Sequence, residues 1–340
     1  MFGDHTYLSG ITSSLSNHFK NIAINALNEF NSRSLSRKPR VLDIGSNDGT
    51  QLRHFKDLGF ECLGVESSSG TAKIANQRGF KTINRFFNLD CAKSLEVKFD
   101  IINAAGVFFH LEELHSVCEG IKLLLEEQGT FIVQFLYMKS IIENGAFDQI
   151  YHEHLLYYTV KTISHLLERH GLQLYNVSLA NIHGGSIIAY ASHKGNKEIT
   201  PSVEKFLREE ELAETNEIIT YKNFAKRIEQ LKLRDLAFLE DCKSKGKKVF
   251  GFGAPVKGNT LLNYYRITSR EIKYLVEKNS LRRNLYAPGS HIPIIIEDEF
   301  EELPDVYYVL AWNFKEEILR NNQEKIANGI EFYFPVDPAY

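Results

Sequence analysis

The chain carries four consecutive residues with proton-transfer chemistry, Tyr151-His152-Glu153-His154, shortly after the apolar run Gly129–Tyr137. A histidine titrates near neutral pH and suits a general base. A carboxylate can fix the tautomer of that histidine, and a tyrosine can hydrogen-bond to a carbonyl or enolate oxygen. These residue types indicate a base site centred on His154. They also fit a polar loop that holds a structural histidine.

A metal site is a poor interpretation of the same four residues. In an extended segment His152 and His154 point one way and Tyr151 and Glu153 the other. Neighbours on alternate faces do not chelate one ion easily, and no further ligand spacing appears in the chain. We therefore expect no metal. A base at this place suits a carbon acceptor, which has to become a carbanion or enolate before it reacts.

A first glycine turn precedes this segment, in the pattern Asp43-x-Gly45-x-x-x-Gly49. It follows a short apolar strand and opens a helical pattern, so backbone N–H groups can approach a ligand closely. Glu66 ends the next predicted strand, where an acid can bind ribose hydroxyls. Asn47 stands where a dinucleotide turn has its middle glycine.

These residues fit either a nicotinamide dinucleotide or S-adenosylmethionine, and two details favour the second. The carboxylate of Asp43 would pair with the ammonium group of a methionine moiety but would repel a pyrophosphate. The glycine spacing also departs from the dinucleotide pattern at Asn47. Phe86 and Phe87 follow the third predicted strand, where they either flank an adenine or pack in the core.

A second glycine turn, Gly251-Phe252-Gly253, continues through Lys257 to Thr260 and also joins a strand to a helix. The order of its residues is not that of a P-loop. Lys257 and the N–H groups of the helix would suit a diphosphate, and a turn that only packs two domains is the alternative. The run His183-Gly184-Gly185-Ser186 predicts a hairpin turn that is either plain turn chemistry or a contact to the acceptor.

Strands and helices alternate along the chain, which predicts α/β domains built on doubly wound parallel sheets. Two strands near 172–192, separated by turn residues, predict a closing hairpin. We expect four parts: an N-terminal segment with a covering helix (1–38), a ligand-binding domain (39–195), a helical connector (196–246) and a smaller Rossmann-like domain (247–340). At 340 residues, two domains are expected.

Composition narrows the functional classes. The hydrophobic fraction of 43%, the charged fraction of 24% and the formal net charge of −3 are those of an ordinary globular chain. The sequence has no basic stripe, which argues against nucleic acid or an anionic membrane as the main partner. The longest apolar runs have the length of strands, and the start shows no signal-peptide pattern. The four cysteines show no C-x-x-C spacing, so reduced thiols and a cytoplasmic location are expected.

Six motifs in order resemble the sugar C-methyltransferase family, which acts at C3 of nucleotide-diphospho-4-ketosugars in the biosynthesis of branched deoxysugars. The resemblance spans nearly the whole chain, and six ordered motifs are far more specific than any one. The matching stretches are 46–50 (SNDGT), 150–155 (IYHEHL), 183–186 (HGGS), 251–264 (GFGAPVKGNTLLNY), 288–294 (PGSHIPI) and Trp312-Asn313.

The resemblance implies a class I S-adenosylmethionine methyltransferase domain, a C-terminal Rossmann-like domain and a sugar nucleotide as partner. It implies that His154 is the base, with Tyr151 and Glu153 beside it, and that Tyr7 and His183 belong to the catalytic set. The donor would contact Asp43, Gly45, Asn47, Gly49, Glu66, Phe86 and Phe87. The sugar nucleotide would contact Gly253, Lys257, Asn259, Thr260, Glu277 and His291.

One departure from the family concerns the start of the chain. Family members often begin with a small cysteine-ligated zinc domain, whereas this sequence starts directly at Met1 and lacks the cysteine pairs. Either the lineage of this chain lacks that domain, or the chain is shortened. The expected activity is C-methylation at C3 of a nucleotide-linked 4-ketosugar through an enolate. The alternatives are an O- or N-methyltransferase, a nicotinamide-dependent sugar enzyme and an inactive sugar-nucleotide binder.

Overall fold

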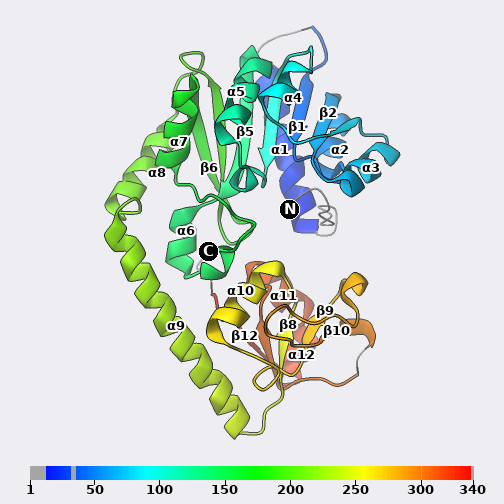
Figure 1. The fold of residues 1–340 in the computed structure, drawn as a ribbon, viewed down its shortest axis with the longest axis vertical. Coiled ribbons are helices and arrows are strands. Elements are labelled where there is room, and N and C mark those ends of the chain that lie inside the picture. The colour runs from blue at the N-terminus through cyan, green and yellow to red at the C-terminus, as the bar shows by residue number, and fades with distance from the viewer. Residues whose placement is uncertain (1–12, 32–35, 300, 338–340) are drawn as a thin grey trace. The chain divides into compact units, whose positions relative to one another are not determined.

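The computed structural model describes residues 13–31, 36–299 and 301–337. The chain divides into two compact units. The N-terminal unit comprises residues 1–137 and 155–215, and the C-terminal unit comprises residues 138–154 and 216–340. Each unit is built on its own β-sheet (Figure 1).

The sheet of the N-terminal unit has the strand order β3-β2-β1-β4-β5-β7-β6 among the described residues. Strands β1 to β5 pair in parallel, and β7 pairs antiparallel with both β5 and β6. This confirms the expected α/β fold with a terminal hairpin. The strands are β1 Arg40–Ile44, β2 Glu61–Glu66, β3 Thr82–Asn84, β4 Phe99–Ala105, β5 Leu125–Leu136, β6 Leu172–Ala180 and β7 Ser186–His193.

Helix α1 (Ser13–Asn31) covers one face of this sheet. Its apolar residues recur at helical spacing, and Phe19, Ile22, Ala23 and Ala26 are buried against side chains of β1, β4 and β5. The other helices of the unit are α2 Thr50–Asp57, α3 Ser69–Gln77, α4 Leu89–Lys93, α5 Leu114–Leu124, α7 Val160–Arg169 and α8 Pro201–Leu212, with the short 3₁₀ helix η3 Phe108–His110.

Residues 138–154 leave the N-terminal unit and belong to the C-terminal one. A bridge between Tyr137 and Tyr158 closes the base of this excursion. The backbone N–H of Leu155 then donates to the carbonyl of Phe109, 2.9 Å away, where the chain rejoins the N-terminal unit. The excursion contains α6 (Met138–Asn144) and the 3₁₀ helix η4 (Phe147–Gln149). The expected continuous domain 39–195 is therefore interrupted at this segment.

The C-terminal unit has an all-parallel sheet in the order β10-β9-β8-β11-β12 among the described residues. Its hydrophobic core includes the buried residues Phe250, Phe252, Val276, Tyr307 and Val309. The elements are α9 Ile218–Ser244, β8 Val249–Phe252, α10 Val256–Tyr265, β9 Leu275–Glu277, η5 Ser280–Arg282, β10 Ile294–Ile296, η6 Glu297–Glu299, β11 Val306–Val309, η7 Trp312–Phe314, α11 Lys315–Asn321, α12 Gln323–Ala327 and β12 Glu331–Tyr333.

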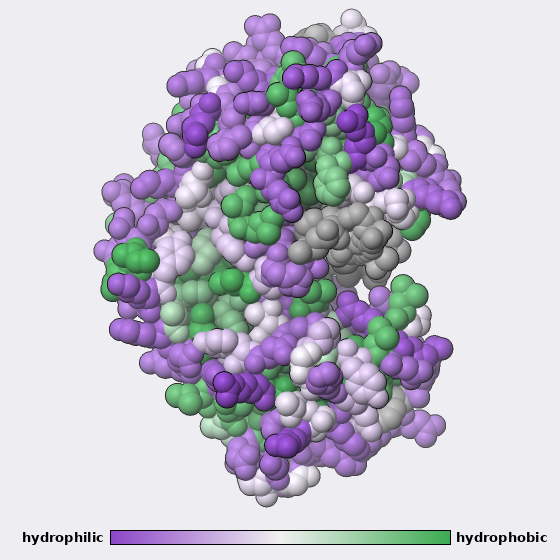
Figure 2. Space-filling view, in the orientation of Figure 1, coloured by the Kyte–Doolittle hydropathy of each residue, from purple (hydrophilic) through white to green (hydrophobic). Residues whose placement is uncertain are grey.

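The expected helical connector is helical, but it is divided between the units. Helix α8 belongs to the N-terminal unit, and α9 belongs to the C-terminal one. A buried carboxylate fixes α9 to its sheet, because Asp235 accepts hydrogen bonds from the hydroxyls of Tyr308 (2.8 Å) and Tyr333 (2.6 Å). In the parts of the chain that the structure describes, no helix is both long and apolar enough to cross a bilayer. Hydrophilic colour predominates on the face shown in Figure 2.

Candidate active site

The first glycine turn joins β1 to α2 and takes backbone conformations that side chains rarely adopt. Gly45 and Gly49 have φ angles of 72° and 83°. A Cβ on Gly45 would lie 2.9 Å from the side chain of Val107, and one on Gly49 would lie 2.5 Å from the ring of Phe80. Asn47 also has a positive φ, of 50°, which asparagine tolerates better than most residues. Glycine is therefore required at positions 45 and 49, and Asn47 adopts a positive φ at the position of the middle glycine of a dinucleotide turn.

Asp43 lies at the end of β1 and is only 2% exposed. Its Oδ1 accepts a hydrogen bond from Asn103 Nδ2 at 2.7 Å, while its Oδ2 has no partner among the described residues. Burial raises the pKa of Asp43 to about 7, against the opposing effect of Asn103, and nearby Glu66 adds to the rise. A buried carboxylate oxygen without a partner is costly, so it favours a cationic donor group. The ammonium of a methionine moiety is such a group.

Glu66 ends β2 and holds the glycine turn through its carboxylate. Oε2 accepts from the backbone N–H of Asn47, and Oε1 accepts from that of Ser68, both at 2.8 Å. Oε1 also accepts from Ser67 Oγ at 3.5 Å, whereas Oε2 keeps a second lone-pair site. Glu66 can thus shape the turn and still accept from a ribose hydroxyl at Oε2.

The two phenylalanines after β3 occupy different environments. Phe86 is 62% exposed, whereas Phe87 is 6% exposed and lies where a Cβ on Gly120 of α5 would touch its ring. Phe86 is therefore available to flank an adenine. Phe87 packs in the core, which is the alternative that the sequence left open.

Two polar contacts near this turn were missed by the sequence reasoning. Asn103 on β4 orients Asp43. Asp48 is buried, accepts from Thr50 Oγ1 at 2.7 Å, and pairs with Arg78 at 2.7 Å. The signal for Asp48 was its place just before the helix, where a carboxylate caps N–H groups. Asn103 gave no signal, because it interrupts an apolar run without a recognisable spacing.

The residues at this turn fit a methyl donor of the S-adenosylmethionine type. Asp43 Oδ2 would hold the ammonium, Glu66 would hold the ribose, and the glycine backbone would allow close approach. When bound, the donor supplies a methyl group on a positively charged sulfur.

The segment from Tyr151 to His154 forms a turn rather than an extended strand. The backbone N–H of His154 donates to the carbonyl of Tyr151 at 2.9 Å. The rings of Tyr151 and His154 lie against each other with centroids 4.1 Å apart and planes tilted by 40°. The segment is therefore not extended, which is the condition for the alternation of side chains. His152 is exposed, and Glu153 is half-buried.

The imidazole of His154 has a defined tautomer. Its Nδ1 lies 2.8 Å from the backbone carbonyl oxygen of Gln149. A carbonyl oxygen can only accept, so Nδ1 carries the hydrogen. In neutral His154 the lone pair is therefore on Nε2. The tautomer is fixed by a carbonyl of its own segment rather than by a carboxylate.

The second glycine turn, in the C-terminal unit, follows β8. Gly253 has a φ of 79°, and a Cβ there would lie 3.0 Å from Ala311. Glu277 at the end of β9 accepts from the backbone N–H of Ala254 at 3.1 Å and of Lys278 at 2.8 Å. Arg282 lies 3.5 Å from the same carboxylate, a cation near this turn that the sequence reasoning overlooked.

The remaining residues predicted for the sugar nucleotide lie in three environments. Asn259 and Thr260 are half-buried on α10, and His291 is exposed in a turn with a φ of 54°. Lys257 is buried, and its Nζ lies 3.5 Å from the centroid of the Trp312 ring. This placement differs from the expected ammonium open to a diphosphate.

The two other residues predicted to be catalytic are Tyr7 and His183. Tyr7 lies outside the described residues. His183 lies in the β6–β7 turn of the N-terminal unit with a φ of 53°. Over the described ranges, no three metal-ligating side chains lie together as a metal site would require.

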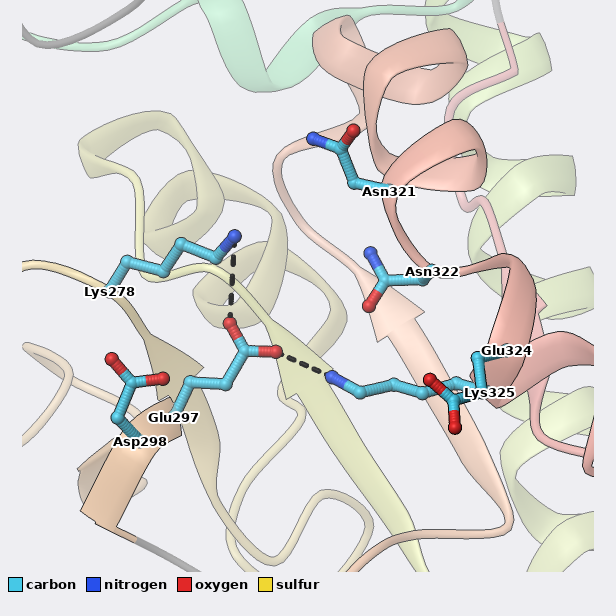
Figure 3. A pocket seen from close by; sticks show the side chains of 7 residues that line it. All are labelled: Lys278, Glu297, Asp298, Asn321, Asn322, Glu324 and Lys325. Carbon is cyan, nitrogen blue, oxygen red and sulfur yellow. Dashed lines mark hydrogen bonds and ion pairs between the residues drawn. The ribbon is translucent and has the colours of Figure 1, made fainter.

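A polar pocket of about 380 Å³ lies elsewhere in the C-terminal unit (Figure 3). Glu297 lies between Lys278 and Lys325, at 3.7 Å and 2.5 Å. The lining side chains carry three acids against two lysines, so the pocket does not suit a diphosphate. They are Lys278, Glu297, Asp298, Asn321, Asn322, Glu324 and Lys325.

Comparison with known families matches both halves of the chain to methyltransferases. Residues 17–177 match the model of a methyltransferase domain, and residues 181–337 match that of a C-methyltransferase C-terminal domain. With the fold and the donor turn, this defines an S-adenosylmethionine-dependent methyltransferase. The C-methyltransferase NovU of Streptomyces niveus is 30% identical over 341 residues, covering 99% of this chain and 80% of that protein. The chain belongs to the sugar C-methyltransferase family.

Two further similarities are shorter. A ubiquinone biosynthesis O-methyltransferase of Glaesserella parasuis serovar 5 (strain SH0165) is 28% identical over 104 residues, covering 28% of this chain and 44% of that protein. The crystal structure of magnesium protoporphyrin IX methyltransferase from Synechocystis PCC 6803 covers 52% of this chain and 79% of its own, with 14% identity and a TM-score of 0.40. The family assignment rests on the longer relative.

Proposed function

We propose that this protein methylates C3 of a nucleotide-diphospho-4-keto-sugar, with His154 as the base. The observation that carries this proposal is the hydrogen bond from His154 Nδ1 to the Gln149 carbonyl, which leaves the lone pair on Nε2. An oxygen or nitrogen acceptor needs little help from a base, whereas a carbon acceptor requires one. A preset imidazole therefore fits the C-methyltransferase family better than O- or N-methylation.

The proposed chemistry begins at the carbon beside the ketone. His154 Nε2 takes the proton from C3, and the electron pair of the broken C–H bond forms an enolate with the C4 carbonyl. Tyr151, whose ring lies against that of His154, would hydrogen-bond to the enolate oxygen, with Tyr7 and His183 as the other candidates. C3 then takes the methyl group of the donor. The electron pair of the broken bond between methyl carbon and sulfur stays on the sulfur.

The acceptor would be held by the C-terminal unit. Gly253 and the backbone N–H groups of the second turn suit a diphosphate, with Arg282 as a nearby cation. Glu277, Asn259, Thr260 and His291 are further proposed contacts for the sugar nucleotide. The donor would be held by Asp43, Glu66 and Phe86 of the N-terminal unit, so methyl transfer needs both units.

The test compares His154→Ala with His152→Ala, an exposed histidine of the same turn. We expect His154→Ala to bind the donor normally and to lose about 10²–10⁴-fold in kcat. It should also lose the exchange of the C3 hydrogen with deuterated water in the absence of donor. His152→Ala should keep both. Near-normal turnover by His154→Ala would remove it as the base, and methylation without carbon exchange in the wild type would indicate an oxygen or nitrogen acceptor.

A further inference from the structure

A buried cluster in the C-terminal unit joins three parts of the chain that are distant in sequence. Asp148 comes from η4, Lys257 from the first turn of α10, and Trp312 from η7. Trp312 Nε1 donates to Asp148 Oδ2 at 2.7 Å, and Lys257 Nζ lies 3.5 Å from the centroid of the indole ring. Asp148 and Trp312 are fully buried. We call these three residues the clamp.

The clamp is one of three sets of contacts that hold the excursion 138–154 on the rest of the C-terminal unit. Arg227 of α9 donates to the carbonyls of Ile142 and Glu143, at 3.1 and 2.8 Å, and so caps the end of α6. Phe147 packs against the rings of Tyr264 and Tyr265, each with its centroid 5.3 Å away.

The clamp lies one residue from the group that orients the base. Gln149, which follows Asp148, supplies the carbonyl that accepts from His154 Nδ1. Asp148 and Gln149 both belong to η4. A displacement of Asp148 would therefore move the Gln149 carbonyl oxygen that accepts from His154 Nδ1.

The clamp contains two groups of opposite charge, the carboxylate of Asp148 and the ammonium of Lys257, and neither has all of its hydrogen bonds made. Burial lowers the pKa of Lys257 to about 8, against the opposing effect of Asp148. Burial likewise raises the pKa of Asp148, while Lys257 and Trp312 lower it. Among the described residues, Asp148 Oδ1 and Lys257 Nζ have no hydrogen-bond partner. Each charge is thus compensated mainly by the other, so removal of either one alone leaves a buried charge.

We propose that Asp148, Lys257 and Trp312 are positioning residues that fix η4 and thereby aim His154 at the acceptor. Lys257 then acts inside the protein and not on the diphosphate. The base is carried by the unit that holds the acceptor, so its orientation toward C3 is set within that unit. This inference rests on the proposed function for His154, but the docking of η4 can be measured without any reaction.

The first test is Trp312→Phe, which keeps the aromatic face for Lys257 and removes the N–H donor to Asp148. Its matched control is Tyr308→Phe, which removes another hydrogen bond from a buried ring to a buried aspartate of the same unit. Hydrogen exchange followed by mass spectrometry would report the amides of residues 147–154. We expect faster exchange there in Trp312→Phe but not in Tyr308→Phe, with kcat lowered about 10²-fold and the KM for the acceptor little changed.

The second test separates the clamp from a diphosphate contact. Lys257→Met and Asp148→Asn should each lower kcat, and the double variant should recover part of the loss because no uncompensated charge stays buried. If Lys257 held the diphosphate, Lys257→Met would raise the KM for the nucleotide sugar, and Asp148→Asn could not rescue it. That result would overturn the proposal.

The two proposals can fail separately. Unchanged exchange at residues 147–154 in Trp312→Phe would refute the clamp whatever His154 does. Faster exchange with an unchanged kcat would refute its positioning role. Full activity in His154→Ala would instead refute the assignment of the base.

Discussion

The two glycine turns of this chain have the same backbone arrangement but differ in the residue two positions before Gly45 and Gly253. In the first, Gly45 N–H donates to the carbonyl of Val65, and in the second Gly253 N–H donates to that of Val276, both at 2.8 Å. In each turn, the acid that ends the following strand accepts a backbone N–H of the turn.

The side chain before each turn makes the difference. Asp43 ends the first strand with a buried carboxylate oxygen that has no partner among the described residues. In the second turn, Gly251 precedes Gly253 by the same two residues, and a Cβ on Gly251 would lie 2.4 Å from Leu275. No acidic side chain fits there, so the second turn lacks the buried carboxylate that Asp43 places at the first.

The strongest test of this comparison is Asp43→Asn. We expect the Kd for S-adenosylmethionine to rise about 10²-fold, because the variant loses the charge that pairs with the ammonium. The folded apo protein should keep its stability, since burial already disfavours the ionised carboxylate. Isothermal titration calorimetry and thermal unfolding would measure the two effects.

Asp100→Asn is the matched control. Asp100 is also a buried acid of the N-terminal sheet, but it accepts two hydrogen bonds from Arg37, at 2.7 and 2.8 Å. We expect that variant to lose stability and to bind the donor normally. A loss of donor affinity only in Asp100→Asn would contradict the role of Asp43.

Substitution of the acid at each turn, Glu66 or Glu277, should have a smaller effect on ligand binding. It tests whether the two turns are separate sites. Glu66→Gln should weaken donor binding about tenfold and leave the KM for the acceptor unchanged. Glu277→Gln should do the reverse, because its carboxylate shapes the second turn. Initial-rate kinetics with each substrate varied in turn would separate the two. If both variants changed the same constant, the assignment of one ligand to each turn would be wrong.

The smallest effect concerns pH. The pKa of Asp43 is raised by burial to about 7 in the folded apo protein, above its ordinary value of 3.8. Its contribution to apo stability is therefore complete below about 4 and is lost as the pH rises through about 7. Donor binding needs the ionised form, so it should strengthen about tenfold from pH 6 to pH 8. Asp43→Asn should abolish both trends, and a trend that survives in it would have another origin.

Much of the fold followed from short-range patterns. The alternation of apolar strands with helices predicted both sheets, and the turn residues near His183 predicted the β6–β7 hairpin. The glycines of the first turn were also predictable from the sequence. In the structure, Gly45 and Gly49 each combine a positive φ with a neighbouring side chain that a Cβ would touch. These features depend on residues near one another in sequence.

The candidate site was predicted less completely. Lys257 has the position of a phosphate-binding lysine in the sequence, yet Asp148 and Trp312, both distant in sequence, surround it. The turn conformation of Tyr151–His154 was missed because its four polar residues have no periodicity that distinguishes a turn from a strand.

By itself, the sequence determined the two glycine turns, the acids that end the following strands and the histidine suited to act as a base. Those features depend on local conformation and residue chemistry. Only the tertiary structure decided that residues 138–154 leave one unit to pack on the other, and which nitrogen of His154 is basic. The first depends on contacts between residues distant in sequence, such as Asp148 with Trp312. The second depends on a hydrogen bond within a turn, whose conformation a pattern of four polar residues does not encode.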